Sequence, residues 1–434
     1  MRAHGAVRFA ALLAIVLVPA VATAQGGACA AGQTACETVR ATAERPVVQD
    51  ALRAIEAFDD RTIADLIALT EIPAPPFGED ERGRHYAQLL RDAGADSVWT
   101  DSVGNVLALR RGAQGSATLA VTGHLDTVFP EGTDVSVEQR GDTLFAPGIA
   151  DDTRGLVAVL AVLRALESTG IETRDDLLFV GTVGEEGLGD LRGVKHLFRQ
   201  GGPRIDAFIS IDGGGDRGVT HQALGSRRYR VTFSGPGGHS WGAFGTANPM
   251  HALGRAVAHF DSAAADFTAS GPRTSYNVGR IGGGTSVNSV PFEAWMEVDM
   301  RSESQARLAA IDSLFRATME RGLREENEAL RRGEPLTVDV RLVGDRPSGE
   351  TQTDAPIVLN AVGATEYMGL EPSLGRSSTD SNIPISLGIP SVTIGGGGES
   401  SGAHSLDEWW RTTDGTRGIQ RAFLIVLATA GTTS

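Results

Sequence analysis

The chain has 434 residues, a formal net charge of −15, and a composition that is 41% apolar and 21% charged. This length accommodates two domains, or one domain with a large insertion, and the composition is that of a folded globular protein rather than a disordered one. The acidic balance argues against nucleic acid or an anionic membrane surface as a partner.

Residues 1–24 have the features of an export signal. Arg2 and Arg8 make the start of the chain basic. They are followed by an apolar run at 12–18 and by the small-residue sequence ATA at 22–24. The run is shorter than a membrane span. We therefore predict that the segment is removed, that the mature protein is periplasmic or secreted, and that it is not attached to a membrane. A retained anchor is the alternative.

Cys29 and Cys36 are the two cysteines of the chain. After export they could close a small disulfide loop near the new N-terminus, or remain free thiols in a frayed tail. The sequence leaves both alternatives open.

From about residue 55, strand-like and helix-like patterns alternate along the chain. This rhythm predicts an α/β fold, with a mostly parallel sheet and helices on both faces. The predicted strands are 118–122, 177–182, 207–211 and 391–394, and the predicted helices are 156–166, 194–199 and 356–368.

Between these segments the order changes to β-α-β-β-α-β, which is the order of a ferredoxin-like α+β layer. We therefore predict a catalytic domain built from residues 25–222 and 347–434, interrupted by an inserted domain at 223–346. The predicted strands of the insertion are 228–234, 275–281, 292–300 and 337–343, and its predicted helices are 249–260 and 305–332.

Acidic and histidine residues follow the predicted strands, and ligands of open α/β sheets bind outside the carboxyl ends of the strands. In GHLDTV, His124 and Asp126 lie two residues apart, so on an extended segment both face the same way. His124 is a candidate metal ligand, and Asp126 is a candidate acceptor that orients its ring. A turn with a satisfied histidine is the alternative.

Two pairs of adjacent acids come next. In GIADDTRG, Asp151 and Asp152 repel each other, and capping of the following helix explains only one of them. In GEEGLG, Glu185 and Glu186 directly follow a strand. One could bind a metal ion while the other accepts a proton from water, although a solvated acidic loop is the alternative.

Asp212, at the end of a strand, and His404 complete the set. Ser405 and Glu408 form an S-x-x-E capping pattern, which predicts a helix directly after His404. Two imidazoles and three carboxylates suit zinc, cobalt or manganese better than calcium or an iron–sulfur cluster. A pair of cations bridged by Asp151 would supply the positive charge that the adjacent aspartates need.

From about residue 60 to the end, the chain resembles the dinuclear-zinc metallopeptidase family of aminoacylase, acetylornithine deacetylase, succinyl-diaminopimelate desuccinylase, peptidase T and bacterial glutamate carboxypeptidase. The motifs that carry this resemblance occur in the family's order: GHLDTV, GIADDTRG, GEEGLG, ISIDGG, GPGGHS, GGTSVNSVP, STDSN and AHSLDEW. The resemblance implies that His124 and Asp212 hold one zinc ion, that Glu186 and His404 hold the other, and that Asp151 bridges them.

The resemblance also implies that Glu185 is the general base and later the acid, and that the peptide bond between Asp151 and Asp152 is cis. The Thr153–Arg154 pair is a departure, because many relatives have a lysine before the glycine.

The inserted domain resembles the family's lid and dimerisation domain, so the resemblance implies a homodimer. His239 matches a histidine that steadies the oxyanion, often from the partner subunit. Asn288 matches a residue that contacts substrate or oxyanion, and Arg301 matches a candidate for binding the substrate carboxylate. A turn at His239 and a bend at Asn288 are the alternatives.

The sequence thus predicts an exported dinuclear zinc peptidase or amidohydrolase, with cobalt or manganese as other metals. Its substrates are expected to be small peptides, cleaved as di- or tripeptides or in a carboxypeptidase-like manner, or N-acyl amino acids. A catalytically silent metal-binding or peptide-binding protein of the same fold is the alternative, and loss of the base would mark it. The exact substrate and the native metal stay open.

Overall fold

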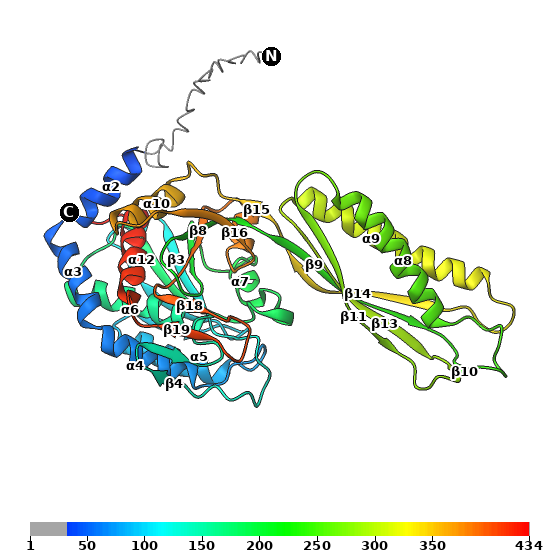
Figure 1. Ribbon diagram of the computed structural model, residues 1–434. Helices are drawn as coiled ribbons and strands as arrows, with labels where there is room; N and C mark the ends of the chain where they lie inside the picture. Colours follow the sequence, from blue (N-terminus) through cyan, green and yellow to red (C-terminus); the bar gives the residue numbers. More distant parts are fainter. Residues whose placement is uncertain (1–32, 434) are drawn as a thin grey trace, which may run out of the picture.

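The computed structural model describes residues 33–433. The predicted export signal and Cys29 lie outside these residues. Figure 1 shows two lobes, a larger body and an elongated small lobe that projects from it. No helix within residues 33–433 has the length and apolar character needed to cross a membrane.

The body contains a nine-stranded sheet. Its order is β1 (Ser97–Thr100), β2 (Val106–Arg110), β6 (Asp176–Thr182), β3 (Thr118–His124), β7 (Ala207–Ile211), β17 (Ser391–Ile394), β8 (Gly218–Ala223) and β15 (Gly349–Glu350), with β16 (Ser373–Ser377) beside β8. The central strands β6, β3, β7 and β17 are parallel, whereas β2 and β8 join this group antiparallel. The predicted α/β class is confirmed.

Alternate residues of the central strands face two separate cores. Leu119 and Val121 of β3 belong to the larger core, while Ala120 between them belongs to the smaller one. The smaller core lies against α7 (Arg192–Leu197) and α11 (Asn382–Ser386). The helices of the larger core are α3 (Pro46–Ala57), α4 (Asp59–Thr70), α5 (Asp80–Asp92), α6 (Thr153–Thr169), α10 (Pro356–Tyr367) and α12 (Gly415–Ala430), with α2 (Gln33–Ala43) packed on α10.

Helix α6 is the centre of the body. Every residue from Thr153 to Leu166 is buried, as expected for a helix that is apolar on all sides. The helix ends at Gly170, whose φ of 64° is left-handed. Its N-terminus directly follows Asp151 and Asp152, so the buried helix anchors the paired aspartates.

A second, antiparallel sheet of the body was not predicted. It has the order β18 (Glu399–Ser401), β19 (Trp409–Arg411), β5 (Thr143–Phe145) and β4 (Glu138–Arg140). This sheet brings the hairpin loop that carries His404 beside the segment that leads to Asp151.

The small lobe, Gly225–Arg346, is an α+β layer. Its elements are β9 (Gly225–Ser234), α8 (Pro249–Thr268), β11 (Thr274–Gly283), β13 (Glu293–Ser302), α9 (Gln305–Glu328) and β14 (Thr337–Arg346). The sheet order β11-β13-β9-β14 is antiparallel, and both helices pack on one face through a core that includes Val231, Met296 and Phe315. The predicted β-α-β-β-α-β order is confirmed, although α9 ends at Glu328 rather than at residue 332.

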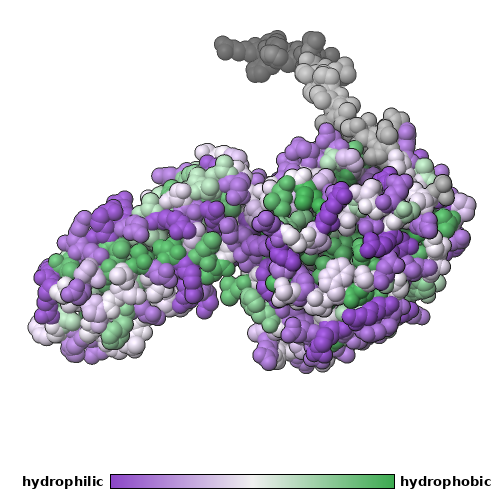
Figure 2. Space-filling model, turned by 180° about the vertical axis from the view of Figure 1, so that it is seen from behind, coloured by the Kyte–Doolittle hydropathy of each residue, from purple (hydrophilic) through white to green (hydrophobic). Residues whose placement is uncertain are grey.

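The remaining short elements are β10 (Gly238–His239) and β12 (Ser289–Val290), which pair near the far end of the small lobe, and the 3-10 turn Gly187–Gly189. The surface is mostly hydrophilic, with a notch where the two lobes meet (Figure 2).

Candidate metal centre and active site

The candidate ligands gather at one edge of the central sheet. His124 ends β3, Glu185 and Glu186 follow β6, and Asp212 follows β7. These strands are parallel neighbours, so their carboxyl ends lie together. His404 reaches the same edge from the loop between β18 and β19.

Two groups of potential metal ligands share Asp151. His124, Asp151 and Asp212 form one group, and Asp151, Glu186 and His404 form the other; the ligand atoms of each group lie within 4.8 Å of one another. Nε2 of His124 is 2.9 Å from Oδ1 of Asp151, and Nε2 of His404 is 3.2 Å from Oδ2 of the same residue. Asp151 therefore turns one carboxylate oxygen toward each group.

The electrostatics of these groups fit divalent cations. The pKa of Asp212 lies well above its usual value, because burial and the neighbouring carboxylates of Asp151 and Asp152 disfavour its charged form. Hydrogen bonds to Asp151 and Glu186 raise the pKa of His404 to about 10. Without cations, Asp212 and His404 thus favour their protonated forms. Cations bound by imidazole and carboxylate donors would let all of the acids ionise.

Asp152 fixes the surrounding backbone. Its carboxylate accepts hydrogen bonds from the main-chain N–H groups of His124 at 2.9 Å and of Gly155 and Gly213 at 3.0 Å each. The peptide bond between Asp151 and Asp152 is cis, as expected. Asp152 therefore joins three of the segments that form the site.

The helix predicted after His404 is wrong. Residues 404–408 form turns that lead into β19, and the carboxylate of Glu408 accepts from the main-chain N–H groups of Gly148 at 2.7 Å and of Ala150 and Asp151 at 2.9 Å each. Glu408 is fully buried. The acid of the S-x-x-E pattern therefore stabilises a turn distant in sequence, rather than capping a local helix.

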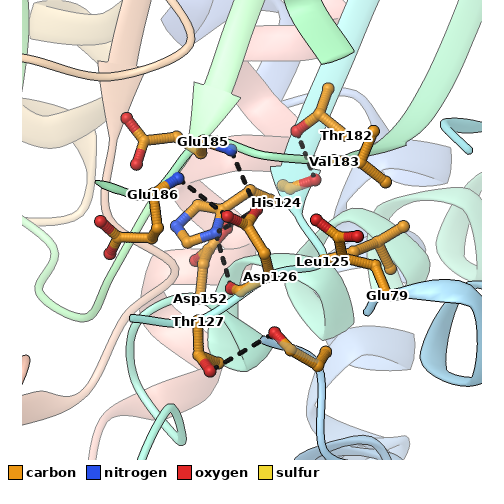
Figure 3. A network of polar contacts seen from close by, with 12 residues as sticks. Glu79, His124, Leu125, Asp126, Thr127, Asp152, Thr182, Val183, Glu185 and Glu186 are labelled. Carbon is orange, nitrogen blue, oxygen red and sulfur yellow. Dashed lines mark hydrogen bonds and ion pairs between the residues drawn. The ribbon is translucent and has the colours of Figure 1, made fainter. Parts of the chain in front are cut away.

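Asp126 positions both glutamates through its carboxylate. Oδ1 and Oδ2 accept from the main-chain N–H groups of Glu185 at 3.0 Å and Glu186 at 2.8 Å (Figure 3). Nδ1 of His124 lies 3.0 Å from the main-chain carbonyl oxygen of Asp126 and 3.6 Å from its carboxylate. The ring of His124 is thus held mainly by the carbonyl, since 3.6 Å is too long for a hydrogen bond.

Glu185 is buried and paired with an arginine that the sequence did not single out. Nη1 of Arg346 lies 2.8 Å from Oε1 of Glu185, and Nη2 of Arg346 also contacts the carbonyl oxygen of Glu185. Burial raises the pKa of Glu185 to about 8, against the opposing charge of Arg346. Arg346 escaped notice because every basic residue except Lys195 is arginine, so that no single arginine stands out.

A cavity of about 500 Å³ opens between the body and the small lobe. Arg301 is one of its lining residues, together with Arg346. His239 and Asn288 are not, since they lie together near the far end of the small lobe, where Ser240 N–H donates to the Asn288 carbonyl at 2.8 Å. The structure therefore brings Arg301 to the site but leaves His239 and Asn288 outside the cavity of this chain.

Comparison with known proteins agrees with the predicted family. Residues 120–427 match the peptidase family M20/M25/M40. The chain belongs to this family. Because its members are peptidases and related amidohydrolases, the chain is a hydrolase of this group, and the resemblance drawn from its motifs is confirmed.

Three known proteins are similar to the chain. An uncharacterized protein of Bacillus subtilis strain 168, YqjE, is 25% identical over 366 residues, which cover 79% of this chain and 91% of that protein. A succinyl-diaminopimelate desuccinylase of Leptothrix cholodnii is 27% identical over 251 residues, covering 53% and 62%. The fold matches a tripeptidase of Staphylococcus aureus with a TM-score of 0.71 at 21% identity, covering 86% and 99%.

Proposed function

We propose that the protein is an exported peptidase or amidohydrolase that depends on two metal ions and cleaves the amide bond of small peptides or N-acyl amino acids. The observation that carries the proposal is the position of Asp151, whose two carboxylate oxygens face His124 and His404 at 2.9 and 3.2 Å. One bridging carboxylate with a separate donor group on each side is the arrangement that a two-metal hydrolase needs.

The types of donor at the site support an assignment of the ligands. His124 and Asp212 would hold one cation, Glu186 and His404 the other, and Asp151 both. Imidazole and carboxylate donors suit zinc, and cobalt and manganese share this preference. When bound, the two cations polarise the scissile carbonyl and lower the pKa of water at the site.

Glu185 supplies the proton transfers in this proposal. It accepts a proton from the attacking water and then passes it to the nitrogen of the leaving amine. Glu185 lines the cavity next to the candidate ligand Glu186, so its carboxylate lies where a bound water would give up its proton. Arg346 holds the side chain of Glu185, and the hydrogen bond from the main-chain N–H of Glu185 to Asp126 holds its backbone. These contacts fix the carboxylate of Glu185 in the lining of the cavity.

The small lobe is proposed as a lid and dimerisation domain. His239 and Asn288 lie outside the cavity of this chain, so their proposed oxyanion role requires movement of the small lobe or a contribution from a second subunit. A molecular mass in solution equal to two chains would support the dimer, and full activity of a strict monomer would exclude the contribution in trans.

The assigned base is tested with Glu185→Gln, which keeps the size of the side chain and removes the basic oxygen. Metal content by elemental analysis should equal that of the wild type, at two ions per chain, while turnover of dipeptides and N-acyl amino acids falls about 10²–10⁴-fold. Glu320→Gln, at an exposed position of α9, is the matched control and should change neither.

Retained turnover in Glu185→Gln would refute the base, and active enzyme without stoichiometric transition metal would refute the metal proposal. Export is tested separately by sequencing the N-terminus of the mature protein, which should begin at Gln25.

A further inference from the structure

A second cavity lies within the body, beside the cavity that holds the candidate metal ligands. It has a volume of about 500 Å³ and forms where the loop after β7 meets the loop after β17, strand β19 and the start of α12. Strands β7 and β17 are parallel neighbours, so this cavity also lies at the carboxyl ends of strands, where open α/β sheets bind ligands. Gly214 lines both cavities, which are therefore adjacent.

Glycine residues keep the second cavity open. Gly215 has a left-handed φ of 90°, and a Cβ atom at this position would meet no other atom within 4 Å. Its main-chain N–H donates to the carbonyl oxygen of Gly398 at 2.8 Å, and its own carbonyl oxygen accepts from the N–H of Gly397 at 2.9 Å. The two loops are thus joined through their main chains, and neither Gly215 nor Gly398 places a side chain in the space between them.

The start of α12 brings two carboxylates to one guanidinium group. Nε of Arg417 lies 2.7 Å from Oδ2 of Asp216, and Nη2 of Arg417 lies 3.1 Å from Oδ2 of Asp414. The side chain of Asp414 is 56% exposed, so its carboxylate can accept further hydrogen bonds. The charged residues of the lining are Arg217, Arg411, Arg417, Asp216, Glu399 and Asp414.

Arg217 carries the unpaired positive charge of the cavity. It is exposed, and within residues 33–433 its guanidinium group has neither a hydrogen-bond partner nor an ion-pair partner. Two charged residues lie behind the lining: Asp142 accepts from the hydroxyl of Thr413 at 3.0 Å, and Arg421 donates to the carbonyl oxygen of Gly218 at 2.6 Å. With these two included, four carboxylates and four guanidinium groups surround the cavity. It is therefore neutral as a whole, with one unpaired guanidinium group and one surplus carboxylate.

We propose that the second cavity is a binding site for a zwitterionic amino acid with an apolar side chain. Arg217 binds the α-carboxylate, because a guanidinium group pairs with a carboxylate in a bidentate manner. Asp414 accepts from the α-ammonium group, and the half-buried Trp409 contacts the apolar side chain. A neutral cavity with separated charges favours such a ligand over an ion of either sign.

The size of the cavity agrees with this ligand, since sites for small molecules have volumes of about 300–1,000 Å³. The inference goes beyond the proposed function, because none of its three binding residues belongs to the metal centre or lines the metal cavity.

The test is calorimetry on the metal-loaded protein with leucine and two analogues that each lack one charge. 4-Methylpentanoate has no ammonium group, and 3-methylbutylamine has no carboxylate. Leucine should bind at least about tenfold more tightly than either analogue, because each analogue loses a charged hydrogen bond.

Two variants assign the charges to residues. Arg217→Gln should weaken leucine binding about tenfold and leave the affinity for 3-methylbutylamine unchanged. Asp414→Asn should weaken leucine binding to a similar extent and leave the affinity for 4-methylpentanoate unchanged; asparagine tolerates the left-handed φ of 61° at this position. Arg204→Gln is the matched control, since Arg204 is exposed, pairs with Asp206 and does not line the cavity.

The metal cavity could also bind leucine, and the variants separate the two sites. Equal leucine affinity in the wild type, Arg217→Gln and Asp414→Asn would overturn the inference, because leucine would then bind elsewhere. A crystal structure of the leucine complex should show the carboxylate of leucine against Arg217. Leucine bound only at the candidate metal ligands in that crystal would also overturn the inference.

Discussion

Replacement of Glu408 by glutamine should loosen the turn that carries Asp151. The carboxylate accepts three buried N–H groups, two at Oε1 from Ala150 and Asp151 and one at Oε2 from Gly148. A glutamine oxygen can still accept the pair, but its NH₂ group then faces the N–H of Gly148. One buried donor is left without an acceptor, which costs about 1–3 kcal/mol of unfolding free energy.

The same change should weaken metal binding. Residues that hold a metal ligand in place typically account for about 10–100-fold in metal affinity when they are removed. Both effects are measurable in Glu408→Gln, the first by urea unfolding of the metal-free protein and the second by zinc titration against a competing chelator.

Glu399→Gln is the matched control, because Glu399 lies on strand β18 of the same small sheet and is exposed. It should change the unfolding free energy by less than about 0.5 kcal/mol and leave zinc affinity unchanged. The reasoning fails if Glu408→Gln behaves like Glu399→Gln in both measurements, because the carboxylate of Glu408 would then not fix the turn.

Two further predictions concern the metal ions and the core. Chelation of the metal ions should abolish hydrolysis and lower the melting temperature, because the crowded acids lose their counter-charges. Zinc or cobalt, but not calcium, should restore both properties. A chelated protein with unchanged activity and melting temperature would contradict this prediction. Arg154→Lys should lower the unfolding free energy, measured in urea, by about 1–3 kcal/mol. The reason is that one ammonium group cannot bond to the carbonyls of both Gly396 and Gly415 while stacking on Trp410. A variant as stable as the wild type would show that these contacts are dispensable.

Three of the candidate ligands could be found from the sequence because each follows a strand that the pattern predicts. His124, Glu186 and Asp212 come directly after buried runs whose length and β-branched residues indicate strands. Parallel strands place their carboxyl ends together, so the residues were expected to meet although they are far apart in the chain. The alternation of strands and helices in the sequence was therefore enough to predict that these ligands lie close together.

The rest depended on long-range contacts that a local pattern does not contain. Strands β5, β18 and β19 have three residues each, too few to show a periodicity. Glu408 matched a local capping pattern, yet its partners are the N–H groups around Gly148. Arg346 lay among many other arginines, and only its buried contact with Glu185 distinguishes it.

The position of Arg346 links domain motion to proton transfer. Arg346 is the last residue of strand β14 in the small lobe, while its side chain pairs with Glu185 in the body. Rotation of the small lobe would stretch or compress this ion pair, and with it the electric field at the proton acceptor. A substrate that bridges the lobes would therefore change the basicity of Glu185 as it binds.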